Sequence, residues 1–307
     1  MLEYILRRLF QTIPVMFGVT LAVFLMMHLL PGDPAQIMAG ESADPVQVEA
    51  MREKLGLNDP LHTQYIRYVT NAVQGDLGNS IRTNRSVTSE IFDKRFWITV
   101  ELALIGTALA VIIGLVAGII SATKKYSLSD VSIMIVALFG LSMPNFWLGI
   151  MLIYFFSVNL GWVPVAGWGT WKHMILPAIT LGTGGAAIIA RMTRSSMLEV
   201  INQDYIRTAY AKGVSDKLVI YKHALRNALI PVVTVVGLQF GGLLGGAVIT
   251  ETVFAINGLG RLIIDSIRAY DFPMVQGTIL VCAVLFVFVN FLVDITYRLI
   301  NKRIDLN

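Results

Sequence analysis

The sequence predicts an all-α membrane protein with six transmembrane helices. Of its 307 residues, 55% are hydrophobic and 14% are charged, whereas an ordinary soluble domain is about 25% charged. The hydrophobic residues are gathered into long runs, and an α-helix needs about 20 such residues to cross the ~30 Å hydrocarbon layer of a bilayer. Six runs approach or exceed this length, and they define the expected fold class.

The six expected spans begin close to the N-terminus and end close to the C-terminus. They cover residues 11–30, 98–122, 131–160, 174–190, 229–249 and 277–295. The third contains Pro144, and the fourth is short. The first run follows Arg7 and Arg8, but it is longer than the roughly 7–15 residues of a signal-peptide core, so we expect it to stay in the mature protein. Cys282, in the sixth span, is interpreted as a small packed residue.

Lysine and arginine are distributed unevenly between the two ends of these spans. Fourteen lie in the N-terminal tail, in residues 123–130 and 191–228, and in the C-terminal tail, whereas three lie in the short connections on the other side. Because positive residues are retained in the cytoplasm, both termini and residues 191–228 are predicted to be cytoplasmic. Arg191 and Arg194, at the cytoplasmic end of the fourth span, are interpreted as topology and lipid-headgroup anchors.

The stretch between the first two spans is predicted to be an external amphipathic region. Asp44 and Pro45 are typical of a helix start and Gly56 of its end, and a second helix is expected after Pro60. The chain is thus expected to have three parts: the N-terminal tail and first helix (1–30), the external helical region (31–97), and a five-helix core with a cytoplasmic loop at about 191–228 (98–307).

The expected spans lack the groups that many transport and catalytic mechanisms place inside a membrane. Glu101, Glu251 and Asp294 fall near predicted ends, where water is close, so no proton relay is visible. The chain has no zinc-protease, serine-hydrolase or phosphate-loop motif. We expect no catalytic residue, bound cofactor or metal in this chain. The alternatives, an ion-coupled secondary transporter working without ATPase partners and an intramembrane hydrolase, are disfavoured on the same grounds.

Glycines recur at helical spacing in the fifth span. The residues concerned are Gly237, Gly241 and Gly245, with Gly242 and Gly246 repeating the interval of four. Glycines on one helical face allow the backbone of another helix to approach closely. This pattern predicts either packing within the chain or a subunit or pathway interface, and the glycines alone do not separate the two.

A basic stretch interrupts the apolar runs in the predicted cytoplasmic loop. Asp204 is suited to the N-cap of a short helix and Gly213 to the residue just after its end, which brackets about eight residues. Ser215 is suited to the start of a second helix. The short helix has an apolar and aromatic side and a basic rim, formed respectively by Tyr205, Ile206, Ala209 and Tyr210, and by Arg207, Lys212 and Lys217. Such a helix either packs on its own chain or lies on anionic lipid, or else it docks to a cytoplasmic partner.

Several motifs together resemble a known family. They are DYIRTAYAKG (204–213), HALRNALIP (223–231), LLPGDP (29–34), REKLGLNDPLHTQY (52–65), GDLGNS (75–80), SMPNFWLG (142–149), NGLGRL (257–262) and YDFPMVQG (270–277). The chain resembles the inner-membrane permeases of binding-protein-dependent ABC importers, and is most similar to the first of the two permeases in dipeptide and oligopeptide systems. Tyr210 departs from an arginine that is common in this branch, and Asn257 departs from a proline.

The resemblance implies the type I ABC importer permease fold and a multi-pass protein of the bacterial cytoplasmic membrane. It implies an obligate complex with a second homologous permease, two cytoplasmic ATPases that bind ATP and Mg²⁺, and an external solute-binding protein, with no nucleic acid. The subunit would form half of the pathway for a peptide-like solute. The implied ATPase-coupling residues are Asp204, Tyr205, Ile206, Arg207, Ala209, Tyr210, Lys212 and Gly213.

Overall fold

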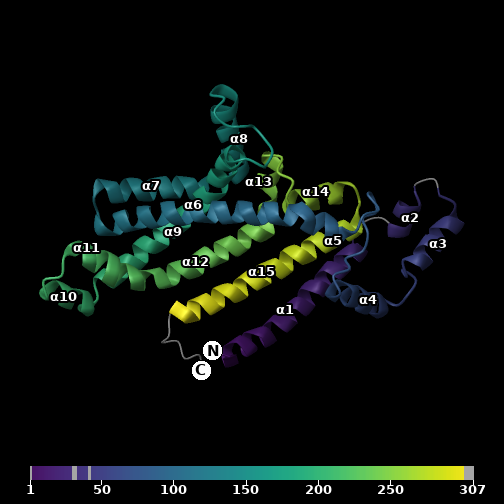
Figure 1. Cartoon of the computed structure of the whole chain (residues 1–307), viewed down its shortest axis with the longest axis horizontal. Coiled ribbons are helices and arrows are strands. Elements are labelled where there is room, and N and C mark those ends of the chain that lie inside the picture. The colour runs from purple at the N-terminus through teal and green to yellow at the C-terminus, as the bar shows by residue number, and fades with distance from the viewer. Residues whose placement is uncertain (1, 30–32, 41–42, 301–307) are drawn as a thin grey trace. The chain divides into compact units, whose positions relative to one another are not determined.

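The computed structural model describes residues 2–29, 33–40 and 43–300, and it confirms the all-α prediction (Figure 1). These ranges contain fifteen α-helices, three π-helical segments and one isolated β-bridge, between Asn79 and Ser86. The chain divides into two compact units. Unit 1 comprises Met1–Thr99 and Asn257–Leu285, and unit 2 comprises Val100–Ile256 and Phe286–Asn307.

Within the described ranges, five helical segments are long and apolar enough to cross a membrane, and a bent pair makes six if it counts as one span. The five are Ile5–Met26, Val87–Thr123, Trp171–Ile201, Asp216–Leu244 and Phe272–Thr296. Each contains most or all of one of the runs predicted from hydropathy. The number of predicted spans is therefore confirmed, provided that the bent pair is counted once.

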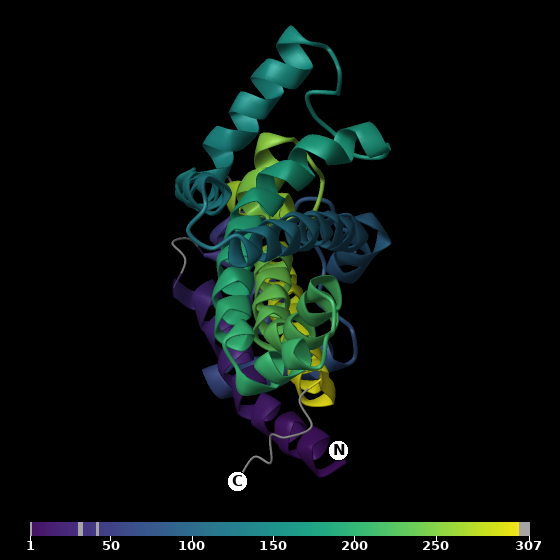
Figure 2. The ribbon, with the colours of Figure 1, turned by 90° about the vertical axis from the view of Figure 1, so that its left-hand side faces the viewer.

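The bent pair corrects the third predicted span, which is not one continuous helix. α7 (Leu128–Ser142) is followed by α8 (Asn145–Leu152) and η2 (Ile153–Asn159) at an angle of 102°. Figure 1 and Figure 2 show α8 turning away from α7. Met143 between them is extended, with a ψ of 126°, because the ring of a following proline disfavours the helical region. Pro144 thus ends one helix and precedes the next.

The fourth predicted span is also corrected, because the helix is much longer than the apolar run. α9 (Trp171–Ile201) has 31 residues, whereas hydropathy marked only residues 174–190. Its last turns contain buried polar side chains such as Thr193 and Ser196. Polar residues lower the hydropathy of a segment without ending a helix. The apolar run therefore marked only part of the length of α9.

Unit 1 contains the predicted external helices. Its complete elements are α1 (Leu2–Leu29), α2 (Pro34–Ala39), α3 (Pro45–Lys54), α4 (Leu61–Val73), α5 (Val87–Glu90), η1 (Ile91–Arg95) and α14 (Leu259–Arg268). The Asp44 side chain caps α3 by accepting from the Val46 amide, and Gly56 follows the helix with a φ of 65°. Both predicted boundaries are confirmed, as is the start of α4 after Pro60. α2 was not predicted, although Asp33 and Pro34 form the same type of start.

The core of unit 1 joins segments that are far apart in the sequence. Its buried residues are Val87, Ile91, Leu259, Leu262, Met274 and Cys282. The interpretation of Cys282 as a small packed residue is confirmed, since it is 8% exposed. Asp271 adds a polar link, because its carboxylate accepts from the Ser80 hydroxyl and, at 3.1 Å, from the Ile81 amide.

Unit 2 is built around α9. Its further elements are α7, α8, η2, α10 (Asp204–Ala211), α11 (Asp216–Leu218), η3 (Val219–Ala224), α12 (Leu225–Gly246) and α13 (Val248–Val253), together with most of α6 (Phe96–Thr123) and the end of α15 (Phe272–Ile300). A methyl group added at Gly114 of α6 would lie 2.7 Å from Ile189 of α9. Glycine therefore allows these two helices to pack closely.

Glu251 of α13 lies in surroundings that the sequence did not indicate. It was expected near water at the end of a span, but it is fully buried in unit 2. Glu101 is exposed as expected, and its carboxylate accepts a 3.1 Å hydrogen bond from Trp168 Nε1. Glu251 is buried because α12 ends at Gly246 and the next helix, α13, carries Glu251 into the packed interior of unit 2.

Candidate functional site

The candidate site is the short helix α10 and the structure that holds it. α10 spans eight residues, as predicted, but its first residue is Asp204 and its N-cap is Gln203. The prediction of Asp204 as the N-cap is wrong by one position. Asp204 instead lies in the first turn, where its carboxylate is 3.7 Å from Arg207 and where negative charge complements the helix dipole.

Gly213 ends this helix as predicted. It has a φ of 75°, which glycine adopts without strain. The Gly213 amide donates to the Tyr210 carbonyl at 2.9 Å, and the Val214 amide donates to the Ala209 carbonyl at 3.3 Å. These two bonds form a Schellman motif, which satisfies carbonyls at the end of a helix. The geometry of the turn is thus determined by this glycine.

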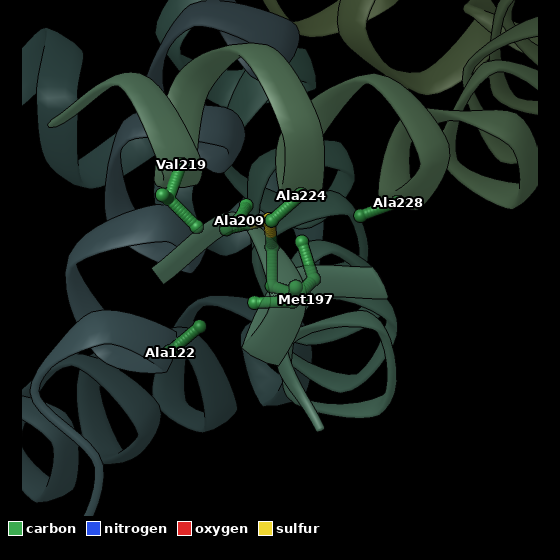
Figure 3. Packing of buried hydrophobic residues seen from close by; sticks show 7 residues of the cluster. Ala122, Met197, Ala209, Val219, Ala224 and Ala228 are labelled. Carbon is green, nitrogen blue, oxygen red and sulfur yellow. The ribbon is translucent and has the colours of Figure 1, made fainter. Parts of the chain in front are cut away.

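One side of α10 is buried against its own chain. Ile206 is fully buried and Ala209 is 9% exposed. They belong to a cluster that we name the α10 seat, which consists of Ala122, Met197, Ile206, Ala209, Val219, Ala224 and Ala228. Figure 3 shows side chains of this cluster from α6, α9, α10, η3 and α12 gathered around one another. An isolated eight-residue helix is marginal in water, so α10 depends on this packing.

The seat divides residues that the sequence had grouped on one side of the helix. Ile206 and Ala209 face the chain, whereas Tyr205 and Tyr210 are 44% and 43% exposed. Arg207 and Lys212 are exposed as well. Ile206 and Ala209 are therefore able to hold the helix but not to form an outer contact surface. Tyr205, Arg207, Tyr210 and Lys212 are available to a partner.

The chain leaves α10 through a second helix that leads into a span. Ser215 occupies the N-cap of α11, as predicted, although its side chain makes no capping bond. α11, η3 and α12 then form one segment from Asp216 to Leu244. The beginning of this segment, together with Ser215, lines an open groove of about 520 Å³, formed by Ser215, Lys217, Leu218, Tyr221, Lys222 and Arg226. Lys217, Lys222 and Arg226 make this groove basic. Of these, Lys217 belongs to the basic rim predicted for the short helix.

A charge pair next to the α10 seat, formed by a buried carboxylate and a partly exposed arginine, was not predicted from the sequence. Arg194 of α9 donates to both carboxylate oxygens of Asp130 on α7, from Nε and Nη2, each at 2.7 Å. The Ser121 hydroxyl and the Tyr126 amide also donate to this carboxylate, the latter at 3.0 Å. Asp130 is 2% exposed. The Arg194 side chain is 25% exposed, so water screens the pair, and removing one member should cost less than the value of about 3–5 kcal/mol that is typical of a fully buried pair.

This pair corrects the interpretation of Arg194 as a headgroup anchor. Arg191, one turn earlier on α9, is exposed as that interpretation requires. Arg194 is turned inward because Asp130 attracts it. The sequence contains an acid at the start of one apolar helix and an arginine in another, but their separation of 64 positions conceals the pairing.

The glycines of α12 lie in different surroundings. A methyl group at Gly237 would collide with the Val293 side chain, and one at Gly241 would lie 3.4 Å from Phe286. Both glycines therefore pack within the chain, which was one of the two alternatives. Gly242 has nothing within 4 Å of this position. The packing of Gly245 and Gly246 lies outside what the structure describes.

Comparison with known proteins gives the family of the chain. Residues 114–306 match the family "Binding-protein-dependent transport system inner membrane component", and residues 1–103 match the N-terminal family of the same systems. Glutathione transport system permease proteins from Escherichia coli (strain K12) and Shigella dysenteriae serotype 1 (strain Sd197) are each 48% identical over 304 residues, which are 99% of both chains.

A solved structure supports the fold. The inward-facing MetNI methionine ABC transporter matches 69% of this chain and 96% of its own chain, with a TM-score of 0.60 and 20% identity. At this identity the match shows the fold alone. The family matches and the near-complete coverage of the relatives are decisive for membership. The chain belongs to the binding-protein-dependent transport system inner membrane components, the multi-pass permease subunits of ABC importers.

Proposed function

We propose that this permease imports a peptide-like solute and that α10 is its coupling helix, the element through which cytoplasmic ATPases drive transport. The observation that supports this most directly is the arrangement of α10. Ile206 and Ala209 hold it on the ends of several helices, while Tyr205, Arg207 and Tyr210 are presented outward. Aromatic and arginine side chains are favoured anchors in interface pockets.

The proposed sidedness follows from charge. The loop that carries α10 belongs to the face with fourteen lysine and arginine residues, against three in the short connections of the other face. Both termini and α10 would then be cytoplasmic. Residues 31–97 would lie outside, and we assign α3 and α4 to the docking face for the solute-binding protein. The chain would then have three parts: the N-terminal tail and first helix (1–30), the external helical region (31–97), and the membrane core with its cytoplasmic loop (98–307).

The relatives indicate which solute to test first. Their names assign them to glutathione transport, and they match this chain over 99% of its length. Glutathione is a short peptide, which agrees with the peptide-importer motifs of the sequence. We propose glutathione as the first solute to test within the wider class of small peptides. The family and the fold give the ion-coupled alternative no support.

Co-purification tests the proposed function. An affinity tag on this chain should recover the second permease and the two ATPases of the same host. Replacing Arg207 and Tyr210, for example by Arg207→Glu with Tyr210→Ala, should release the ATPases because these exposed side chains form the proposed contact. The matched control is Lys124→Glu with Lys125→Ala, on the exposed turn between α6 and α7. Solute transport by the purified single chain, or undiminished ATPase recovery with the α10 variant, would contradict the proposal.

A further inference from the structure

The residues that hold Asp130 lie directly beside the α10 seat. Ser121 is followed in the sequence by Ala122, and Arg194 precedes Met197 by three residues, about one helical turn. Ala122 and Met197 are both members of the seat. The helix ends that pack against α10 are therefore the same helix ends that bind Asp130.

α7 contacts α9 at a second place, farther along both helices. A methyl group at Gly140 would lie 2.9 Å from Thr183 Cγ2. Asp130 and Gly140 are ten residues apart on α7, and Thr183 and Arg194 are eleven apart on α9, in the opposite order. The two helices thus run antiparallel over about 15 Å. The charge pair lies at the end near α10, and the close contact lies near the bend after Ser142.

α7 presents mainly apolar side chains away from α9. Val131, Ile135, Val136, Leu138 and Phe139 are 50–70% exposed. Hydrophobic attraction is not directional, so these exposed side chains do not by themselves fix the position of α7. The bidentate bond between Arg194 and Asp130 is directional, and separating it would leave a charge without its partner in buried surroundings. The pair therefore fixes the Asp130 end of α7 on α9, while the close contact between Gly140 and Thr183 holds the other end.

We propose that the Asp130–Arg194 pair transmits movement of α10 to α7. This inference rests on the proposed function of α10 as the coupling helix. When the ATPases displace α10, the seat displaces the ends of α6 and α9. Ser121 and Arg194, on those ends, then move Asp130, and α7 follows as far as the bend at Pro144. Asp130 and Arg194 are positioning residues, since they act through α7.

The test compares two arginines of α9 in the assembled importer. This chain, its partner permease and the ATPases are reconstituted in liposomes with glutathione-loaded binding protein. Glutathione imported per ATP hydrolysed is measured, together with the amount of ATPase retained in the complex. Arg194→Gln should retain the ATPases and hydrolyse ATP, but import about ten-fold less solute per ATP, as expected for the loss of a coupling interaction. Arg191→Gln, at an exposed position of the same helix, should behave as the wild type.

Arg194→Lys keeps the experiment decisive if Arg194→Gln does not assemble. Lysine preserves the charge but cannot form the two parallel bonds, so it should assemble and import an intermediate amount of solute per ATP. A wild-type ratio in either assembled variant would overturn the inference. A loss of import that is fully matched by a loss of ATPase retention would also overturn it, because the pair would then be purely structural. A wild-type chain that retains no ATPase would instead contradict the proposed function.

Discussion

The side-chain amide of Asn227 donates a 2.8 Å hydrogen bond to the hydroxyl oxygen of Tyr205. Tyr205 is the second residue of α10, and Asn227 is the third residue of α12. The bond therefore joins the two ends of the segment that contains α10, the Gly213 turn, α11 and η3. Because the Tyr205 ring is also 44% exposed, one side chain both fastens α10 and contributes to its outer surface.

Tyr205→Phe should loosen this segment while keeping the ring. A hydrogen bond contributes about 0.5–1.5 kcal/mol net, so the rate of hydrogen exchange in α10 should rise roughly two- to ten-fold. Tyr210→Phe is the control, because the Tyr210 hydroxyl makes no hydrogen bond within the described ranges. Equal exchange rates in the two variants would show that the Asn227 bond does not stabilise the segment.

Ile206→Ala should weaken the packing of α10 against the α10 seat. Truncating a buried isoleucine typically costs about 2–5 kcal/mol, and an eight-residue helix has little stability of its own to offset the loss. We expect weaker ATPase retention and strongly increased hydrogen exchange across α10. Arg207→Ala removes a neighbouring exposed side chain and should leave the exchange rates unchanged. Slow exchange in Ile206→Ala would mean that the seat is not what holds α10.

Substitutions at Gly213 should act through the backbone alone. The position has a φ of 75° and nothing within 4 Å of an added methyl group. Alanine should therefore cost about 1–2 kcal/mol in the left-handed conformation, and asparagine less. Proline should cost more, because it also removes the amide that bonds to the Tyr210 carbonyl. ATPase recovery should decrease in the order Asn, Ala, Pro, and a different order would argue against the turn geometry.

Gly237 and Gly242 should respond oppositely to the same substitution. Gly237→Ala would press on Val293, and overpacking of this kind costs about 1–3 kcal/mol, measurable as a lower melting temperature of the purified chain. Gly242→Ala faces open space among the described residues and should raise the melting temperature, because alanine favours a helix interior by about 0.8–1 kcal/mol over glycine. A similar decrease in both variants would contradict the intrachain packing described for Gly237.

The local features of this chain followed from the sequence. The length of each apolar run is set by the thickness of a bilayer, and the ends of α3 and α10 are set by residues such as Asp44 and Gly213 that act within a few positions. Pro144 was visible as well, but a proline in an apolar run permits either a kink or a complete break. The 102° bend became clear only from the structure.

The fold class, the approximate spans, the short helix before Gly213 and the family could all be predicted, because hydropathy, capping and motifs are local along the chain. Only the packed structure shows which side of α10 faces inward, that Glu251 is buried, and that Arg194 binds Asp130 across 63 intervening residues. These outcomes depend on which helices lie side by side. Two residues on separate helices meet only after packing has placed their backbones within reach, and a single sequence does not contain that distance.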